Sequence, residues 1–165
     1  MVNNQEKALA IGIVWEQLEW GGVDSYLGYL LSDWPNKDDV ITIYYNKGNK
    51  GAQRLQTITS DLENVHFVEV SSYFINYGRS NLFSRLVKVF TYLVTPFLFL
   101  LAALQYKKLF IDKSPDVVMV QNGGYPGSYG NISAIFGAAW AGVPVRTLVI
   151  HHAATKPDLF HGWFR

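Results

Sequence analysis

Residues 8–31 read ALAIGIVWEQLEWGGVDSYLGYLL, an apolar run followed by a glycine pair and then by apolar residues at helical spacing. The run at 8–14 is continuous rather than alternating, which is typical of a strand buried on both faces. After the glycines, apolar residues recur three and four positions apart and predict a helix over 23–31; they are Val23, Tyr26, Leu27, Leu30 and Leu31. This strand, loop and helix form the first unit of an α/β fold.

The same alternation continues to the end of the chain. Short runs rich in β-branched or apolar residues predict four more strands, at 40–45, 65–70, 116–121 and 145–150. A long helical region at 81–108 contains Pro96, so we expect a kink or two helices there. A helix of small residues at 131–141 should end at Gly142. We therefore predict one α/β domain over 1–165, a Rossmann-like parallel sheet with helices on both faces.

Composition excludes several classes of protein. Hydrophobic residues make up 49% and charged residues 16% of the chain, so it is not a disordered or fibrous protein. The net charge of +1, without a long basic block, disfavours nucleic acid as a partner. There are no cysteines, so neither disulfides nor a thiolate metal site can form. With no secretory signal pattern at the N-terminus, we expect a cytoplasmic protein.

The expected ligand site follows from the fold class. Ligands of open parallel sheets bind beyond the carboxyl ends of the strands, where the direction of winding reverses. Three loops of unusual composition follow predicted strands: residues 15–22, residues 122–130 and the pair His151 and His152. The fold class places these three loops at one edge of the sheet.

Gly21 and Gly22 precede the first predicted helix, where backbone amides could approach an anion at the helix N-terminus. The alternative is a tight turn that needs positive φ. A dinucleotide-binding fingerprint is absent, because the glycines do not follow the G-x-G-x-x-G spacing. The pair is thus a candidate phosphate or sugar contact, and a dehydrogenase domain is disfavoured.

The other two loops supply polar candidates. Asn122, Gly123 and Gly124 open a flexible turn that could line a sugar pocket or be an ordinary strand-to-helix loop. At the last strand end, one imidazole of His151 and His152 could hydrogen-bond a phosphate or hydroxyl. Adjacent strand residues point to opposite faces, so this pair is a poor metal site, and we expect no metal and no cofactor.

Two further features stay open. Glu16 and Glu19 could be paired carboxylates, but they flank an aromatic loop and are as readily solvated, so neither is our candidate nucleophile. The apolar segment 87–104 nearly reaches the roughly 20 residues of a membrane span. It could span a bilayer, form a buried kinked core helix, or form a core helix that also rests on a membrane surface.

Three segments together resemble the group 1 glycosyltransferases of family 4 type. Residues 21–24 (GGVD) resemble their G-G-[VA]-E segment, with Asp24 in place of the usual Glu. Residues 114–120 (SPDVVMV) are similar to their K-P-D-V-V-H-V strand, and residues 141–145 (AGVPV) to their A-G-[VI]-P-V turn. His151 is similar to the histidine that follows that strand in many members. The order and spacing of the segments match across nearly the whole chain.

The resemblance implies half of a two-domain GT-B enzyme, usually retaining and metal-independent, that uses a nucleotide-sugar donor. This half would shape the site for a saccharide or lipid-linked acceptor, at the inner face of the membrane if the apolar helix touches it. Gly21 and Gly22 would lie near the donor diphosphate, His151 near the transferred sugar, and His152, Asn122, Gly123 and Gly124 would help line the pocket.

Departures from the family pattern limit what it implies. Met119 replaces the usual histidine, Arg146 enters the last strand, and the acidic E-x(7)-E motif of the donor-binding domain is not in this sequence. We expect that domain to lie outside residues 1–165, and the donor to bind mainly through it. The alternative is a non-catalytic subunit that recruits the acceptor for a separate catalytic chain.

Overall fold

The computed structural model describes residues 7–19, 21–74, 82–123 and 128–152, with the side chains of 82–92 left out. Five parallel strands form one sheet in the order β3-β2-β1-β4-β5. They are β1 (Ala10–Trp15), β2 (Val40–Asn46), β3 (Val65–Val70), β4 (Val117–Asn122) and β5 (Val145–Ile150). The predicted fold class, a Rossmann-like parallel sheet between two helical layers, is confirmed.

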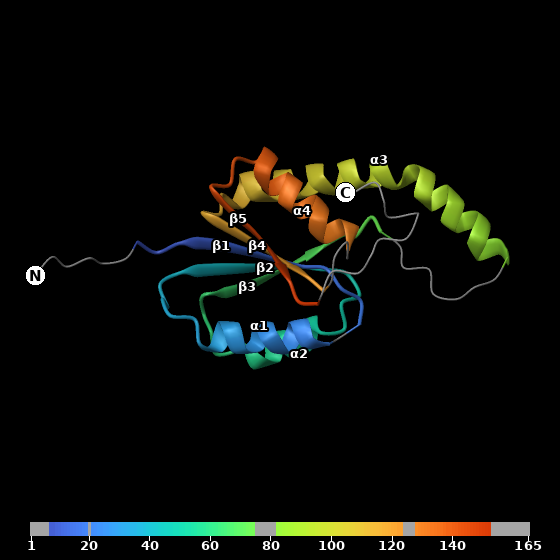
Figure 1. The fold of residues 1–165 in the computed structure, drawn as a ribbon. Coiled ribbons are helices and arrows are strands. Elements are labelled where there is room, and N and C mark those ends of the chain that lie inside the picture. The colour runs from blue at the N-terminus through green and yellow to red at the C-terminus, as the bar shows by residue number, and fades with distance from the viewer. Residues whose placement is uncertain (1–6, 20, 75–81, 124–127, 153–165) are drawn as a thin grey trace, which may run out of the picture.

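Helices cover both faces of the sheet (Figure 1). On one face lie α1 (Gly22–Ser32) and α2 (Ala52–Ile58), and on the other lie α3 (Leu82–Lys113) and α4 (Tyr129–Trp140). Helix α2 was not predicted: its seven residues, AQRLQTI, bury only Ala52 and Leu55. So short and polar a segment carries little helical periodicity of its own.

Strand alternation divides the core into two layers. Ile11, Ile13 and Trp15 of β1 pack with Leu27 and Leu31 on the α1 side. Their neighbours Gly12 and Val14 face α3 and α4, where buried residues from both helices and from β4 meet; these include Tyr106, Phe110, Val118, Val120, Ala134 and Ala138. Apolar residues on both faces explain why the strand sequences read as continuous apolar runs.

The long helix α3 is one element with Pro96 inside it. Figure 1 shows it bending between its halves, with its N-terminal half extending beyond the sheet. A bend is the expected result of proline, which removes one backbone hydrogen bond and displaces the preceding turn. Gly137 of α4 lets the two helices approach closely, since a Cβ there would lie 2.7 Å from the Ala103 carbonyl oxygen.

Candidate functional site

The winding of the sheet reverses between β1 and β4. From β1 the chain proceeds through β2 to β3 on one side, and then returns to β4 and β5 on the other. Parallel sheets leave a crevice at this point, beyond the carboxyl ends of the two central strands. The residues at the carboxyl ends of these two strands are Glu16, directly after β1, and Gln121 and Asn122, the last two residues of β4.

Successive side chains of a strand point to opposite faces of the sheet, and this separates these residues into two groups. Gln121 follows Met119, which packs on the α1 side of the sheet. Asn122 follows Val120, and Glu16 follows Val14, both of which pack under α3 and α4. The candidate site therefore has an α1 side and an α4 side.

His151 lies on the α1 side, where its ring contacts residues from two elements. Its Nε2 is 2.8 Å from Gln121 Oε1, and its ring meets that of Tyr26 edge to face at 4.9 Å. The backbone N–H of His151 donates to the Asn122 carbonyl oxygen at 3.1 Å. His152 is exposed. The structure thus brings His151, but not His152, against the end of β4 and the first turns of α1.

The protonation of His151 follows from these contacts. Burial lowers the pKa of His151, and the neighbouring charge of His152 lowers it further. Because the Gln121 oxygen accepts, Nε2 carries the proton in the neutral ring and Nδ1 is the acceptor. In this tautomer Nε2–H is engaged by Gln121, and Nδ1 of the neutral ring stays available to accept a hydrogen bond from a hydroxyl group.

Gly21 and Gly22 begin α1 with open space around them. Gly21 is extended, at φ −177°, and neither residue is among the positive-φ glycines. The alternative of a positive-φ turn is therefore wrong. A Cβ on either glycine would meet nothing within 4 Å, so packing does not require glycine. The backbone here is open to the approach of another molecule.

Asp24 occupies part of this helix start. Its Oδ1 accepts a 2.6 Å hydrogen bond from Gly21 N–H, which is one half of a capping box, because Gly21 has no side chain to form the other half. Its Oδ2 is buried and has no hydrogen-bond partner among the described residues. A phosphate bound here would have to rely on the other amides of the first turn, because the Gly21 amide is taken and Asp24 competes for the helix dipole.

Glu16 is the central residue of the α4 side, a charged residue that comes directly after the apolar strand β1. Its side chain is 8% exposed. Tyr106 Oη donates to Glu16 Oε1 at 2.7 Å, and Ser72 Oγ donates to Oε2 at 3.2 Å. Burial raises the pKa of Glu16, and the two hydrogen bonds oppose that rise. The pKa of Tyr106 lies well above its usual range, first because of burial and then because of the Glu16 charge.

The first turn of helix α4 packs against Glu16 and hydrogen-bonds to its backbone. Asn131 Oδ1 accepts from Glu16 N–H at 3.0 Å, and Asn131 Nδ2 donates to the Glu16 carbonyl at 3.2 Å. A Cβ on Gly130 would come within 2.5 Å of Glu16 Oε1 and closer still to Oε2. The carboxylate therefore lies at the positive end of the α4 dipole, with its position fixed on several sides.

Asn122 supports the loop that leads into α4. Its Oδ1 accepts from Ser128 N–H at 3.1 Å, and Ser128 in turn caps the helix. The buried amides Asn122 Nδ2 and Gln121 Nε2 have no partner among the described residues, so both have unused donors at the crevice. Gly123 is half-buried with space around it, and Gly124 lies outside the described residues.

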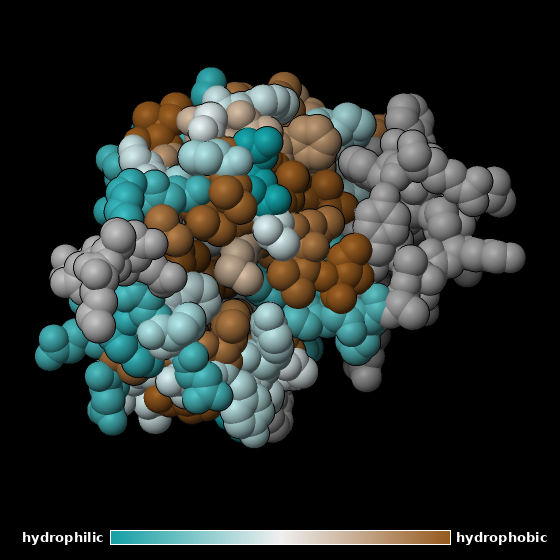
Figure 2. Space-filling model, turned by 60° about the vertical axis from the view of Figure 1, so that its left-hand side comes forward, coloured by the Kyte–Doolittle hydropathy of each residue, from teal (hydrophilic) through white to brown (hydrophobic). Residues whose placement is uncertain are grey.

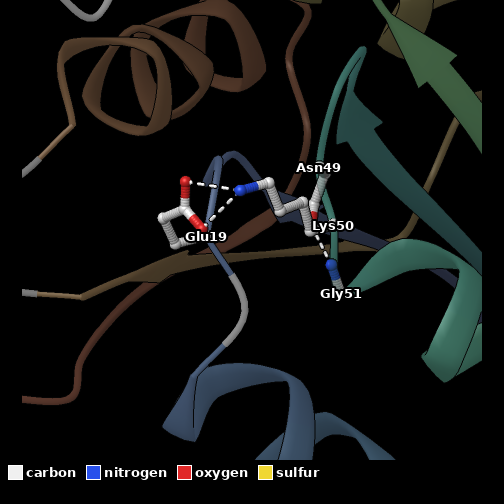
Figure 3. Close-up of polar contacts among 4 residues, drawn as sticks. All are labelled: Glu19, Asn49, Lys50 and Gly51. Carbon is white, nitrogen blue, oxygen red and sulfur yellow. Dashed lines mark hydrogen bonds and ion pairs between the residues drawn. The ribbon is translucent and has the colours of Figure 1, made fainter. Parts of the chain in front are cut away.

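The two candidate carboxylates are not a pair. Glu19 points to the surface, where its oxygens accept from Lys50 Nζ at 2.8 and 2.9 Å (Figure 3). The sequence did not distinguish Glu16 from Glu19, since either could have been solvated, whereas the structure buries Glu16. Its position directly after a central strand was the available signal, since that position faces the crevice in a parallel sheet.

A cavity of about 230 Å³ lies elsewhere, on the α3 side of β1, β2 and β3 and next to the C-terminal end of α3. Gly12, Tyr44, His66 and Lys113 are among its lining residues. Burial and the Asp112 charge raise the pKa of Tyr44 to about 12. Figure 2 brings this side of the molecule forward and shows apolar residues, in brown, across the middle of the face. The cavity shares no residue with the candidate site at the carboxyl ends.

Comparisons with known proteins give a partial likeness. No protein-family model and no curated protein matches the sequence. A solved UDP-N-acetylglucosamine 2-epimerase is 15% identical with a TM-score of 0.49, covering 86% of this chain and 33% of its own. UDP-GlcNAc 2-epimerase from Neisseria meningitidis, bound to UDP-GlcNAc, is 12% identical with a TM-score of 0.49, covering 94% and 35%. This chain spans about a third of the length of both structures.

Proposed function

We propose that this chain is the acceptor-side domain of a retaining, metal-independent GT-B glycosyltransferase. The complete enzyme would move a sugar from a nucleotide-sugar donor to a saccharide or lipid-linked acceptor, and a second domain would hold most of the donor. The three segments that resemble the group 1 glycosyltransferases support the proposal. They correspond to the start of α1, to β4 with the residues before it, and to the turn into β5.

The observation that carries the proposal is the position of His151. Its ring lies between Gln121 and Tyr26, so it links the end of β4 to the helix that begins beside Gly21 and Gly22. Nδ1 of the neutral imidazole would accept a hydrogen bond from a hydroxyl group of the transferred sugar. Such a bond accelerates transfer only if it is stronger in the transition state than in the ground state.

The α4 side would receive the acceptor. Glu16 Oε2 accepts one hydrogen bond from Ser72, and the unused amide donor of Asn122 lies on the same side, at the end of the neighbouring strand β4. Sugar hydroxyl groups both donate and accept, so a carboxylate on the same side as an amide donor suits them. In this proposal Glu16 positions an acceptor hydroxyl and forms no covalent intermediate.

Kinetics of the enzyme that joins this domain to its donor-binding domain would test the assignment. His151→Ala should lower turnover about 10-fold or more, which corresponds to about 1.4 kcal/mol of transition-state stabilisation. His152→Ala is the matched control and should leave turnover within about twofold, an activation difference of about 0.4 kcal/mol.

Melting temperatures of both variants would show that they remain folded. Wild-type turnover in folded His151→Ala enzyme would refute the role of this residue. A loss confined to His152→Ala would mean that the other face of β5 carries the chemistry. Sugar transfer that needs a separate catalytic chain would instead favour the acceptor-recruiting subunit.

A further inference from the structure

Helix α3 has an exposed apolar surface that the proposed function does not use. Residues Leu93–Lys113 are long and apolar enough to cross a membrane, yet only 28% of the apolar window is buried. Leu93 is 73% and Phe97 61% exposed, and Leu100 and Leu104 are also exposed. Their spacing of four, three and four residues places them on one face. We call these four residues the α3 stripe.

The opposite face of the same helix is part of the core. Ala102, Ala103, Tyr106 and Phe110 are buried, and Tyr106 reaches Glu16. A spanning orientation would remove these side chains from the sheet and from α4, so the helix lies along the protein instead. The α3 stripe, about 16 Å long at 1.5 Å per residue, is therefore presented sideways. This geometry suits a helix lying in the plane of a membrane interface.

Charge identifies the kind of surface that the stripe fits. The 32 residues of α3 include five basic side chains and one acidic one, whereas the whole chain has a net charge of +1. Lys108 is exposed and follows Leu104 by four residues, which extends the same face of the helix. Basic residues beside an apolar helical face are attracted to anionic lipid headgroups.

We propose that the α3 stripe lies on an anionic lipid bilayer, with its apolar side chains at the acyl boundary and Lys108 among the headgroups. The interaction does not depend on sugar transfer, because it uses the outer face of the helix. It would hold the candidate site at a fixed distance from the membrane, since Tyr106 joins α3 to Glu16. A lipid-linked acceptor would then be met at the bilayer surface.

Co-sedimentation with vesicles tests the proposal on the chain itself. Vesicles of phosphatidylcholine alone would be compared with vesicles that contain phosphatidylglycerol, at low and high salt. The chain should bind the anionic vesicles and bind them more weakly in high salt. Leu93→Ser/Phe97→Ser should lower the partition coefficient at least 10-fold. Tyr29→Ser, which alters an aromatic residue of α1 that is 76% exposed, is the control and should have no effect.

Lys108→Glu separates the charge contribution from the apolar one. It should weaken binding at low salt and have little effect at high salt, while circular dichroism confirms that each variant is folded. Equal binding by wild type and by the double serine variant would overturn the proposal. So would sedimentation velocity that shows self-association through the stripe without binding to vesicles, because a second copy would then be the occupant.

Discussion

Gly130→Ala tests the fit between helix α4 and Glu16. The new Cβ would come within 2.5 Å of Glu16 Oε1 and closer to Oε2, so the carboxylate or the helix must move. Glu16 is not free to move, because Tyr106 holds its side chain and Asn131 holds its backbone. Overpacking of this kind costs about 2 to 3 kcal/mol. Alanine returns up to about 1 kcal/mol of helix propensity, so the net loss should be about 1 to 2 kcal/mol.

The sign of the effect should reverse when the carboxylate is removed. In a Glu16→Ala background, Gly130→Ala has space, and only the propensity gain of up to about 1 kcal/mol should remain. Gly28→Ala in α1 is the matched control, because its Cβ would meet the Ile58 side chain at an ordinary 3.7 Å. That control should stabilise the protein by about 0.5 to 1 kcal/mol in both backgrounds.

Urea denaturation followed by circular dichroism gives the free energies of unfolding for this cycle. The slope m should be unchanged, so that the midpoints report stability. Equal destabilisation by Gly130→Ala with and without the Glu16 carboxylate would show that the new Cβ does not clash with Glu16. A stabilising effect in the wild-type background would show the same.

Two further predictions concern the same region. Gly137→Ala should destabilise the protein more than Gly130→Ala, by about 3 kcal/mol or more. Its Cβ would lie 2.7 Å from the Ala103 carbonyl oxygen and 2.9 Å from Lys107 N, which are backbone atoms. A smaller loss in urea denaturation would show that α3 and α4 can move apart at little cost in free energy. Burial raises the pKa of Glu16 in the folded state above its ordinary value of 4.5, so the folded state keeps the Glu16 proton to a higher pH than the unfolded state does. The free energy of unfolding should therefore decline as the pH rises from 4.5 through the folded pKa. Glu16→Gln should flatten that decline in melting temperature, and an unchanged pH profile would contradict the burial of an ionisable group.

The sheet could be predicted from the sequence because each buried parallel strand is a short, continuous run of apolar residues. Residues 116–121 were predicted as a strand, and β4 is Val117–Asn122. Local apolar runs and the glycines that follow them are enough to place such elements. Helix α2 was missed because it is short and only two of its residues are buried.

The surroundings of Glu16 could not be predicted in the same way. Its partners Ser72, Tyr106 and Asn131 are 56, 90 and 115 residues away in the sequence. The chain order predicts that strand ends meet, but not which side chain of α3 reaches the crevice. Tyr106 lies next to Lys107 in an apolar helix and carries no local sign of a buried hydrogen bond.

Chemical-shift mapping of the isotope-labelled chain with UDP-, GDP- and dTDP-sugars tests whether this domain forms part of a nucleotide-sugar site at the carboxyl ends of the strands. If this domain contributes only part of the donor site, binding should be weak, with a dissociation constant in the millimolar range, about −4 kcal/mol. The shifts should gather at the amides of Gly21, Gly22, Asn122, Gly123 and His151. Shifts confined to the cavity of Gly12, Thr42, His66 and Lys113, or no shifts at millimolar ligand, would contradict the account.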